Sequence, residues 1–169
     1  SMCDSKLLAS LSSFNCWERA GALQTMARTV DFPAEKADMN MHVHSFFSYN
    51  GEGWSPSRIA LEMKKLGLYG AALCDFDVLD GVDEFRAACA ALRIPAVAGM
   101  ETRVFVPELA EAEINSPGEP GIAYHLGCGF TSSVVPESQK AFAADLKLRA
   151  QKRTRTLVEK VNTLLTESA

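Results

Sequence analysis

Membrane spans, secretion signals and strong charge are all absent from this 169-residue sequence. No apolar run approaches the ~20 residues that a bilayer-spanning helix needs. The opening Ser-Met-Cys-Asp-Ser lacks the basic-then-apolar pattern of a secretory signal. With 17 Lys and Arg against 21 Asp and Glu, the net charge of −4 offers no general attraction to nucleic acid or anionic membranes. A Gly-x-x-x-x-Gly-Lys phosphate loop is also missing.

Cysteines are few and scattered. The five of them form no Cys-x-x-Cys pair, so neither a zinc knuckle nor a thiol redox motif is indicated. Cys74 and Cys128 lie in apolar, strand-like runs, where a reduced cysteine usually acts as a small core residue. We therefore expect free thiols and a cytoplasmic location.

Apolar periodicity outlines a series of helices and strands. The N-terminal stretch has the spacing of one amphipathic helix or two short ones, and Ser55-Pro56 is a good helix start. The expected helices cover residues 5–29, 55–66, 82–92 and 136 onward, and the expected strands cover 39–44, 71–74, 96–106 and 122–130.

Strands that alternate with helices are typical of an α/β fold with a largely parallel sheet. We divide the chain into an N-terminal helical segment (1–37), an α/β region (38–135) and a long C-terminal helix (136–169). The N-terminal helices are expected to cap one end or face of the sheet.

Only three histidines occur, and all fall on expected strands. His42 and His44 are two residues apart, so they project from the same face of one strand. Glu101 and His125 lie on the third and fourth strands. Because the carboxyl ends of parallel strands meet at one rim, we expect these four side chains to converge. Imidazole and carboxylate together suit Zn²⁺, Mn²⁺ or Fe²⁺.

The alternative is purely structural. A single histidine on a strand is more often a hydrogen-bonded core or surface residue than a ligand, and a His-x-His pair alone is a weak signal. An acid and a third histidine at strand ends favour the metal site.

Several short motifs occur in an order that resembles the PHP (polymerase and histidinol phosphatase) superfamily. They run from Asp38-Met-Asn-Met-His42-Val-His44-Ser45 through Ser48-Tyr-Asn-Gly51 and Ser55-Pro56 to Cys74-Asp-Phe-Asp77 and Gly99-Met-Glu101. The resemblance extends to about Phe130 and is closest to a branch with an Asn-Gly loop and an Asp-Phe-Asp motif. It implies a distorted seven-stranded barrel with metals at the carboxyl ends of its strands.

The same resemblance implies roles for individual residues. His42 and His44 would hold one metal, Glu101 would bridge to a second, and His125 would bind that second ion. Where the family usually has a ligand histidine this sequence has Phe76, and a further ligand position is Asn50. We therefore expect one or two divalent ions, with Asp75 orienting a ligand histidine instead of binding metal.

Arg103 lies two residues past Glu101 and shares its strand face, so it could neutralise a substrate phosphate. A salt bridge at the rim of the sheet is an equally good interpretation. We name Asp75 and Arg103 as candidate catalytic residues.

Four strands are fewer than the family's barrel contains, and no histidine follows position 125. The fold we expect is thus a partial, distorted (βα)7-type barrel with parallel strands. A missing C-terminal half, or a partner chain, would complete it.

These observations predict a metal-dependent phosphoesterase that acts on a small phosphorylated substrate or nucleotide through metal-activated water. Nucleic acid is an alternative partner that no motif favours. Two other hypotheses stay open: a degenerate or truncated PHP module with a regulatory or scaffolding role, and an assembly module in which residues 136–168 pair with another chain.

Overall fold

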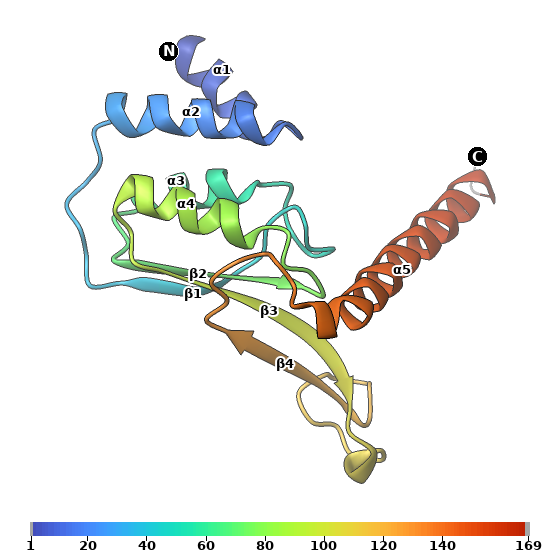
Figure 1. The fold of residues 1–169 in the computed structure, drawn as a ribbon. Helices are drawn as coiled ribbons and strands as arrows, with labels where there is room; N and C mark the ends of the chain where they lie inside the picture. Colours follow the sequence, from blue (N-terminus) through green and yellow to red (C-terminus); the bar gives the residue numbers. More distant parts are fainter. Residues whose placement is uncertain (1, 168–169) are drawn as a thin grey trace. The chain divides into compact units, whose positions relative to one another are not determined.

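The computed structural model describes residues 2–167, and two compact units make up the chain, Ser1–Ser133 and Val134–Ala169. The first unit holds the sheet and four helices (Figure 1). In chain order its elements are α1 (Met2–Ser10), α2 (Cys16–Thr29), β1 (Met39–Val43), α3 (Pro56–Lys65), β2 (Gly70–Phe76), α4 (Val82–Leu92), β3 (Ala96–Phe105), η1 (Pro107–Leu109) and β4 (Ile122–Cys128).

The four strands form one curled, mixed sheet in the order β1-β2-β3-β4. β1, β2 and β3 are mutually parallel, as the alternation of strands and helices predicts. β4 is antiparallel to β3, with Gly99 opposite Cys128 and Phe105 opposite Ile122. The fold is therefore α/β, and its curled sheet resembles half of a barrel. The expectation of parallel strands is wrong for β4.

The connection from β3 to β4 explains the reversal. A parallel pair needs a crossover of a dozen or more residues, usually a helix that covers the sheet. Residues 106–121 contain only the short 3₁₀ helix η1, and their turn is closed by Val106 N–H donating to Gly121 O. The chain therefore returns beside β3 in the opposite direction.

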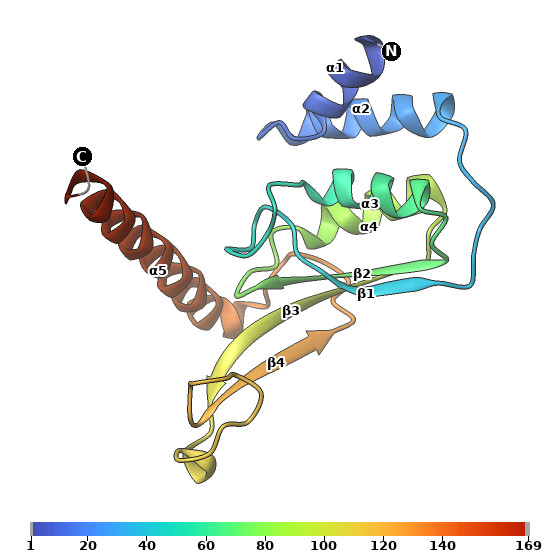
Figure 2. The ribbon, with the colours of Figure 1, turned by 180° about the vertical axis from the view of Figure 1, so that it is seen from behind.

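Helices α3 and α4 lie side by side on one face of the sheet (Figures 1 and 2). Their apolar sides pack on the inward residues of β2, with Leu61, Leu73 and Phe85 essentially inaccessible to solvent. Ser55 caps α3 by accepting the Arg58 N–H, with Pro56 in the first turn. Ser55 and Pro56 therefore begin the helix as the sequence predicted.

The N-terminal helices cover α3 and α4, not the sheet, so the expectation that they cap the sheet is wrong. Leu11 and Leu23 join the core, and Ser55 Oγ donates to the backbone carbonyl of Leu11 at 2.5 Å. Arg19, which is 3% exposed, forms a bidentate ion pair with Glu84 of α4. Its guanidinium also lies over the Phe46 ring. This layer therefore contacts the loop that follows β1.

The second unit consists mainly of α5 (Lys140–Glu167), preceded by the 3₁₀ helix η2 (Glu137–Gln139). None of the described residues of α5 is buried, and its apolar side chains, such as Leu157 and Leu164, are largely exposed. Across residues 2–167, no helix combines the length and apolar character needed to cross a membrane.

Arg19 tests the contribution of the N-terminal layer. We expect Arg19→Met to lower the free energy of unfolding by about 3 kcal/mol, because it leaves the largely buried Glu84 carboxylate without its cation. Urea unfolding measures the change. Arg28→Met, on the exposed side of the same helix, is the matched control and should stay within about 0.5 kcal/mol of wild type. Equal effects of the two substitutions would show that the ion pair does not anchor this layer.

Candidate metal centre

Two imidazoles and one carboxylate meet on the face of the sheet that α3 and α4 leave uncovered. The His42 Nε2 lies 2.9 Å from Glu101 Oε2, and the His44 Nε2 lies 3.6 Å from the same oxygen. One ligand atom from each residue falls within 4.8 Å of the others. Among the described residues this is the single group of three or more His, Cys, Asp or Glu side chains with that property.

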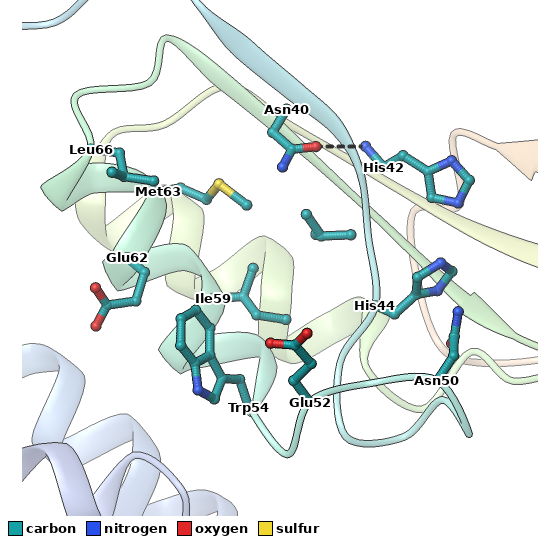
Figure 3. Close-up of a pocket in the computed structure, with 11 residues that line it drawn as sticks. Asn40, His42, His44, Asn50, Glu52, Trp54, Ile59, Glu62, Met63 and Leu66 are labelled. Atoms are coloured by element: carbon teal, nitrogen blue, oxygen red, sulfur yellow. Dashed lines mark hydrogen bonds between the residues drawn. The ribbon is translucent and has the colours of Figure 1, made fainter.

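The sheet explains why residues 59 positions apart meet. His42 of β1 and His44, directly after the strand, project to the same side, away from α3 (Figure 3). In the parallel pairing of β2 and β3, Glu101 is opposite Phe76, so both side chains lie on that same side. Strand alternation and register thus bring the three ligands together.

The donor set fits one divalent cation. Two imidazole nitrogens and a carboxylate oxygen are typical ligands of Zn²⁺, Mn²⁺ and Fe²⁺, and three protein ligands leave positions open for water. Glu101 is only 6% exposed, so its carboxylate needs a cation or several hydrogen bonds nearby. The His42 and His44 imidazoles are the groups that lie close enough to meet that need.

His44 is prepared for coordination by its surroundings. Burial lowers the pKa of His44, and the nearby Glu101 carboxylate opposes this effect only in part. The neutral imidazole, which is the form that binds metal, is therefore favoured. Its buried Nδ1 has no hydrogen bond of good geometry, although the Cys74 backbone is close enough to raise the pKa slightly.

Asp75 supports the site indirectly, through hydrogen bonds to Ser45 and not to either histidine. Its two carboxylate oxygens accept the Ser45 N–H and the Ser45 Oγ–H, each at 2.6 Å. Burial raises the pKa of Asp75 to about 6, against the lowering effect of the two Ser45 hydrogen bonds. Asp75 therefore fixes the residue directly after His44, and any effect on the imidazole acts through the backbone.

The loop after β1 is held by contacts that the sequence reasoning missed. Ser48 Oγ accepts the Phe76 N–H and donates to Asn50 Oδ1. A Cβ on Gly51 would lie 2.0 Å from the Ser45 carbonyl oxygen, so only glycine fits there. The Asn-Gly dipeptide was the available signal for this close approach, while nothing in the sequence marked Ser45 and Ser48 as anchors.

Phe76 occupies the position where the family resemblance places a ligand histidine. Its ring stacks on His44, with centroids 5.4 Å apart and planes 17° from parallel. Tyr49 and Tyr124 pack against the same ring. Phe76 thus acts as an aromatic platform for His44.

His125 does not join the other candidate ligands. It is opposite Thr102 in the antiparallel β3–β4 pair, so its side chain lies on the face opposite that of Glu101. The expected convergence assumed a parallel fourth strand, and the reversal of β4 removes that basis. Arg103 does share the face of Glu101, but it forms an ion pair with Glu119.

A groove of about 520 Å³ runs beside the histidines, between β1, the loop that follows it and α3 (Figure 3). Its floor is apolar, and Trp54 and Glu52 form part of its rim. The lining residues are Asn40, His42, Val43, His44, Asn50, Glu52, Trp54, Ile59, Glu62, Met63 and Leu66.

Comparison with known proteins gives one family and several similar folds. The sequence model of the PHP domain family matches residues 40–164. A Bifidobacterium adolescentis protein described as a candidate metal-dependent phosphoesterase is 25% identical, with a TM-score of 0.56 over 79% of this chain. An amidohydrolase from Chromobacterium violaceum, with sulfate bound and no metal, is 22% identical with the same score and coverage. This chain spans 40% of the length of each. No curated protein matches it.

Glu101 provides a direct test of metal binding. We expect Glu101→Gln to weaken Zn²⁺ or Mn²⁺ binding at least tenfold, because the substitution removes the negative ligand while keeping the shape (estimate ~10–100-fold). Isothermal titration calorimetry measures the affinity. Glu52→Gln, a carboxylate in the adjacent groove outside the cluster, is the matched control and should bind as wild type does. Binding that is equally strong in Glu101→Gln would refute the assignment.

Asp75 predicts a pH dependence of stability. Its folded-state pKa of about 6 lies above the ordinary 3.8, because burial favours the protonated carboxyl. The contribution of Asp75 to the free energy of unfolding is therefore greatest below pH 3.8 and is lost as the pH rises through 6. In wild type we expect the free energy of unfolding to fall by about 3 kcal/mol between these limits on account of Asp75, and we expect Asp75→Asn to abolish this fall. Urea unfolding of the metal-free proteins across this range measures it. Parallel curves for wild type and Asp75→Asn would contradict the prediction.

Proposed function

This chain belongs to the PHP domain family, and from that premise we propose that it carries the metal-binding part of a phosphoesterase. The coarser conclusion, a fold and candidate site of metal-dependent hydrolase type, follows from the family match and the fold neighbours. The observation that carries the finer proposal is the meeting of His42, His44 and Glu101 around one point.

The proposed reaction is hydrolysis of a phosphomonoester or phosphodiester. A divalent ion held by these residues would supply an acidified water molecule and would polarise a phosphoryl oxygen of the substrate. His42 and His44 act as neutral ligands, and Glu101 contributes the negative charge that holds the ion. Phe76 keeps the His44 ring in place, and Asp75 fixes the backbone beside it. No nucleophilic side chain is required.

We propose Zn²⁺, Mn²⁺ or Fe²⁺ as the ion, since an imidazole and carboxylate set accepts each of them. One ion is the number that the three clustered side chains support. A second ion would need ligands from outside these four strands. We propose that such ligands, with the further strands of a (βα)7-type barrel, come from a longer form of the protein or from a partner chain.

A small phosphorylated compound or nucleotide is the proposed substrate. The description of the Bifidobacterium adolescentis protein as a candidate phosphoesterase supports this class. Arg103 could bind a substrate phosphate only by giving up its ion pair with Glu119.

Free thiols at Cys16, Cys74, Cys89 and Cys128 support a cytoplasmic location.

A degenerate PHP module without turnover is the second candidate. Phe76 favours it, because this side chain fills a ligand position of the family with a ring that cannot coordinate metal. Such a module would bind metal through the same three residues.

Activity on chromogenic esters separates the two candidates. With Mn²⁺ or Zn²⁺ added, we expect hydrolysis of bis-p-nitrophenyl phosphate or p-nitrophenyl phosphate, and a fall in kcat/KM of at least about 100-fold in His44→Ala (an estimate for loss of a metal ligand). His125→Ala is the matched control: it removes an imidazole from the other face and should stay within about twofold of wild type.

Metal binding at 1:1 without hydrolysis of either ester would favour the degenerate module. Turnover that survives in His44→Ala would refute the proposed site altogether.

A further inference from the structure

Two cysteines face each other across a glycine on the same side of the sheet as Glu101. Cys74 of β2 is opposite Gly99 of β3, and Gly99 is opposite Cys128 of β4. Residues opposite one another on adjacent strands project to the same side, so both thiols point to the face of the metal centre. Gly99 adds no side chain between them.

The glycine is what allows the sulfurs to approach. A Cβ on Gly99 would lie 3.3 Å from Cys74 Sγ and 2.7 Å from the Gly127 carbonyl oxygen, so no larger residue fits without displacing its neighbours. The Cys128 thiol is close enough to Cys74 to act as its electrostatic neighbour and hydrogen-bond partner. Cys74 is buried, while Cys128 is exposed and leaves the pair open to solvent.

A disulfide does not fit this arrangement. The two strands are separated by a third, which puts the two Cα atoms about 9–10 Å apart, whereas a disulfide needs less than about 7 Å. A bridging ion has a longer reach: at about 2.3 Å from each sulfur it spans up to about 4.6 Å from one sulfur to the other. The spacing therefore suits an ion better than a covalent bond.

We propose that Cys74 and Cys128 form a second cation site, which takes a thiophilic ion such as Zn²⁺ or Cd²⁺ between the two sulfurs. Binding releases the two thiol protons to solvent and forms two metal–sulfur bonds. Water fills the remaining coordination positions, through the exposed side of Cys128. Sulfur ligands select soft ions, so this site and the imidazole–carboxylate cluster differ in the ions they prefer.

This site is separate from the hydrolytic one but close to it. Glu101 lies two residues from Gly99 on the same face, and its carboxylate contributes to the raised pKa of Cys74. Burial is the larger cause of that rise, to about 11, so Cys74 is an unreactive thiol until an ion displaces its proton. A cation between the sulfurs would therefore lie beside a ligand of the first site, with its charge balanced by the two thiolates.

Cadmium titration of the full chain tests the proposal, because thiolate-to-cadmium charge transfer absorbs in the ultraviolet. The expected result is one such site per chain in wild type, and also in His42→Ala/His44→Ala, which lacks the imidazoles of the first site. Cys128→Ser should lose at least half of the absorbance and bind at least tenfold more weakly. Cys16→Ser, which removes an exposed thiol on α2, should show the same absorbance and affinity as wild type.

Phenylarsine oxide gives a second readout, since a stable adduct requires two thiols within reach of one arsenic atom. Mass spectrometry should show the adduct on wild type and on Cys16→Ser, and its loss in Cys74→Ser and in Cys128→Ser. An unchanged cadmium band in Cys128→Ser, or an adduct that persists in both single variants, would overturn the proposal. Either result would leave the hydrolase proposal intact, because that one depends on His44 and Glu101.

Discussion

The contact between Asp75 and Ser45 is the constraint on which the rest of the site depends. A carboxylate at the end of β2, 1% exposed, accepts two hydrogen bonds from the residue that follows His44. The protein keeps this group in its interior although burial disfavours its charge. Gly81 makes room for it, since a Cβ there would lie 2.8 Å from Asp75 Oδ2. The end of β1, and with it His44, is thereby fixed relative to β2.

Much of the parallel part of the sheet and the three clustered ligands could be predicted from the sequence. His-x-His spacing defines one strand face, and short apolar runs separated by amphipathic helices define β2 and β3. The rest depended on tertiary context. The direction of β4 follows from the absence of an α-helix in residues 106–121, and the register of β4 places His125 opposite Thr102, on the other face from Glu101. The covering of α3 and α4 by the N-terminal helices includes the ion pair of Arg19 with Glu84, and no local pattern singled out Arg19.

Phe76 shows how a lost ligand position can still serve the site. A histidine there could bind an ion, whereas phenylalanine can only pack. In this protein it packs under His44 and is enclosed by Tyr49 and Tyr124. The ring limits the rotation of the imidazole and keeps water from one of its faces. Phe76 therefore adds no ligand atom to the site but holds the His44 imidazole in position.

The position of β1 has a consequence for how the site would release an ion. Within the described residues β1 pairs only with β2, so the strand that carries His42 and leads directly into His44 is an edge strand. Edge strands separate from a sheet at a lower free-energy cost than central ones. If β1 lifts away, two of the three ligands leave together and Glu101 stays behind on β3. The residence time of a bound ion would then be set by how often this strand frays, and any chain that pairs with its free side would lengthen that time.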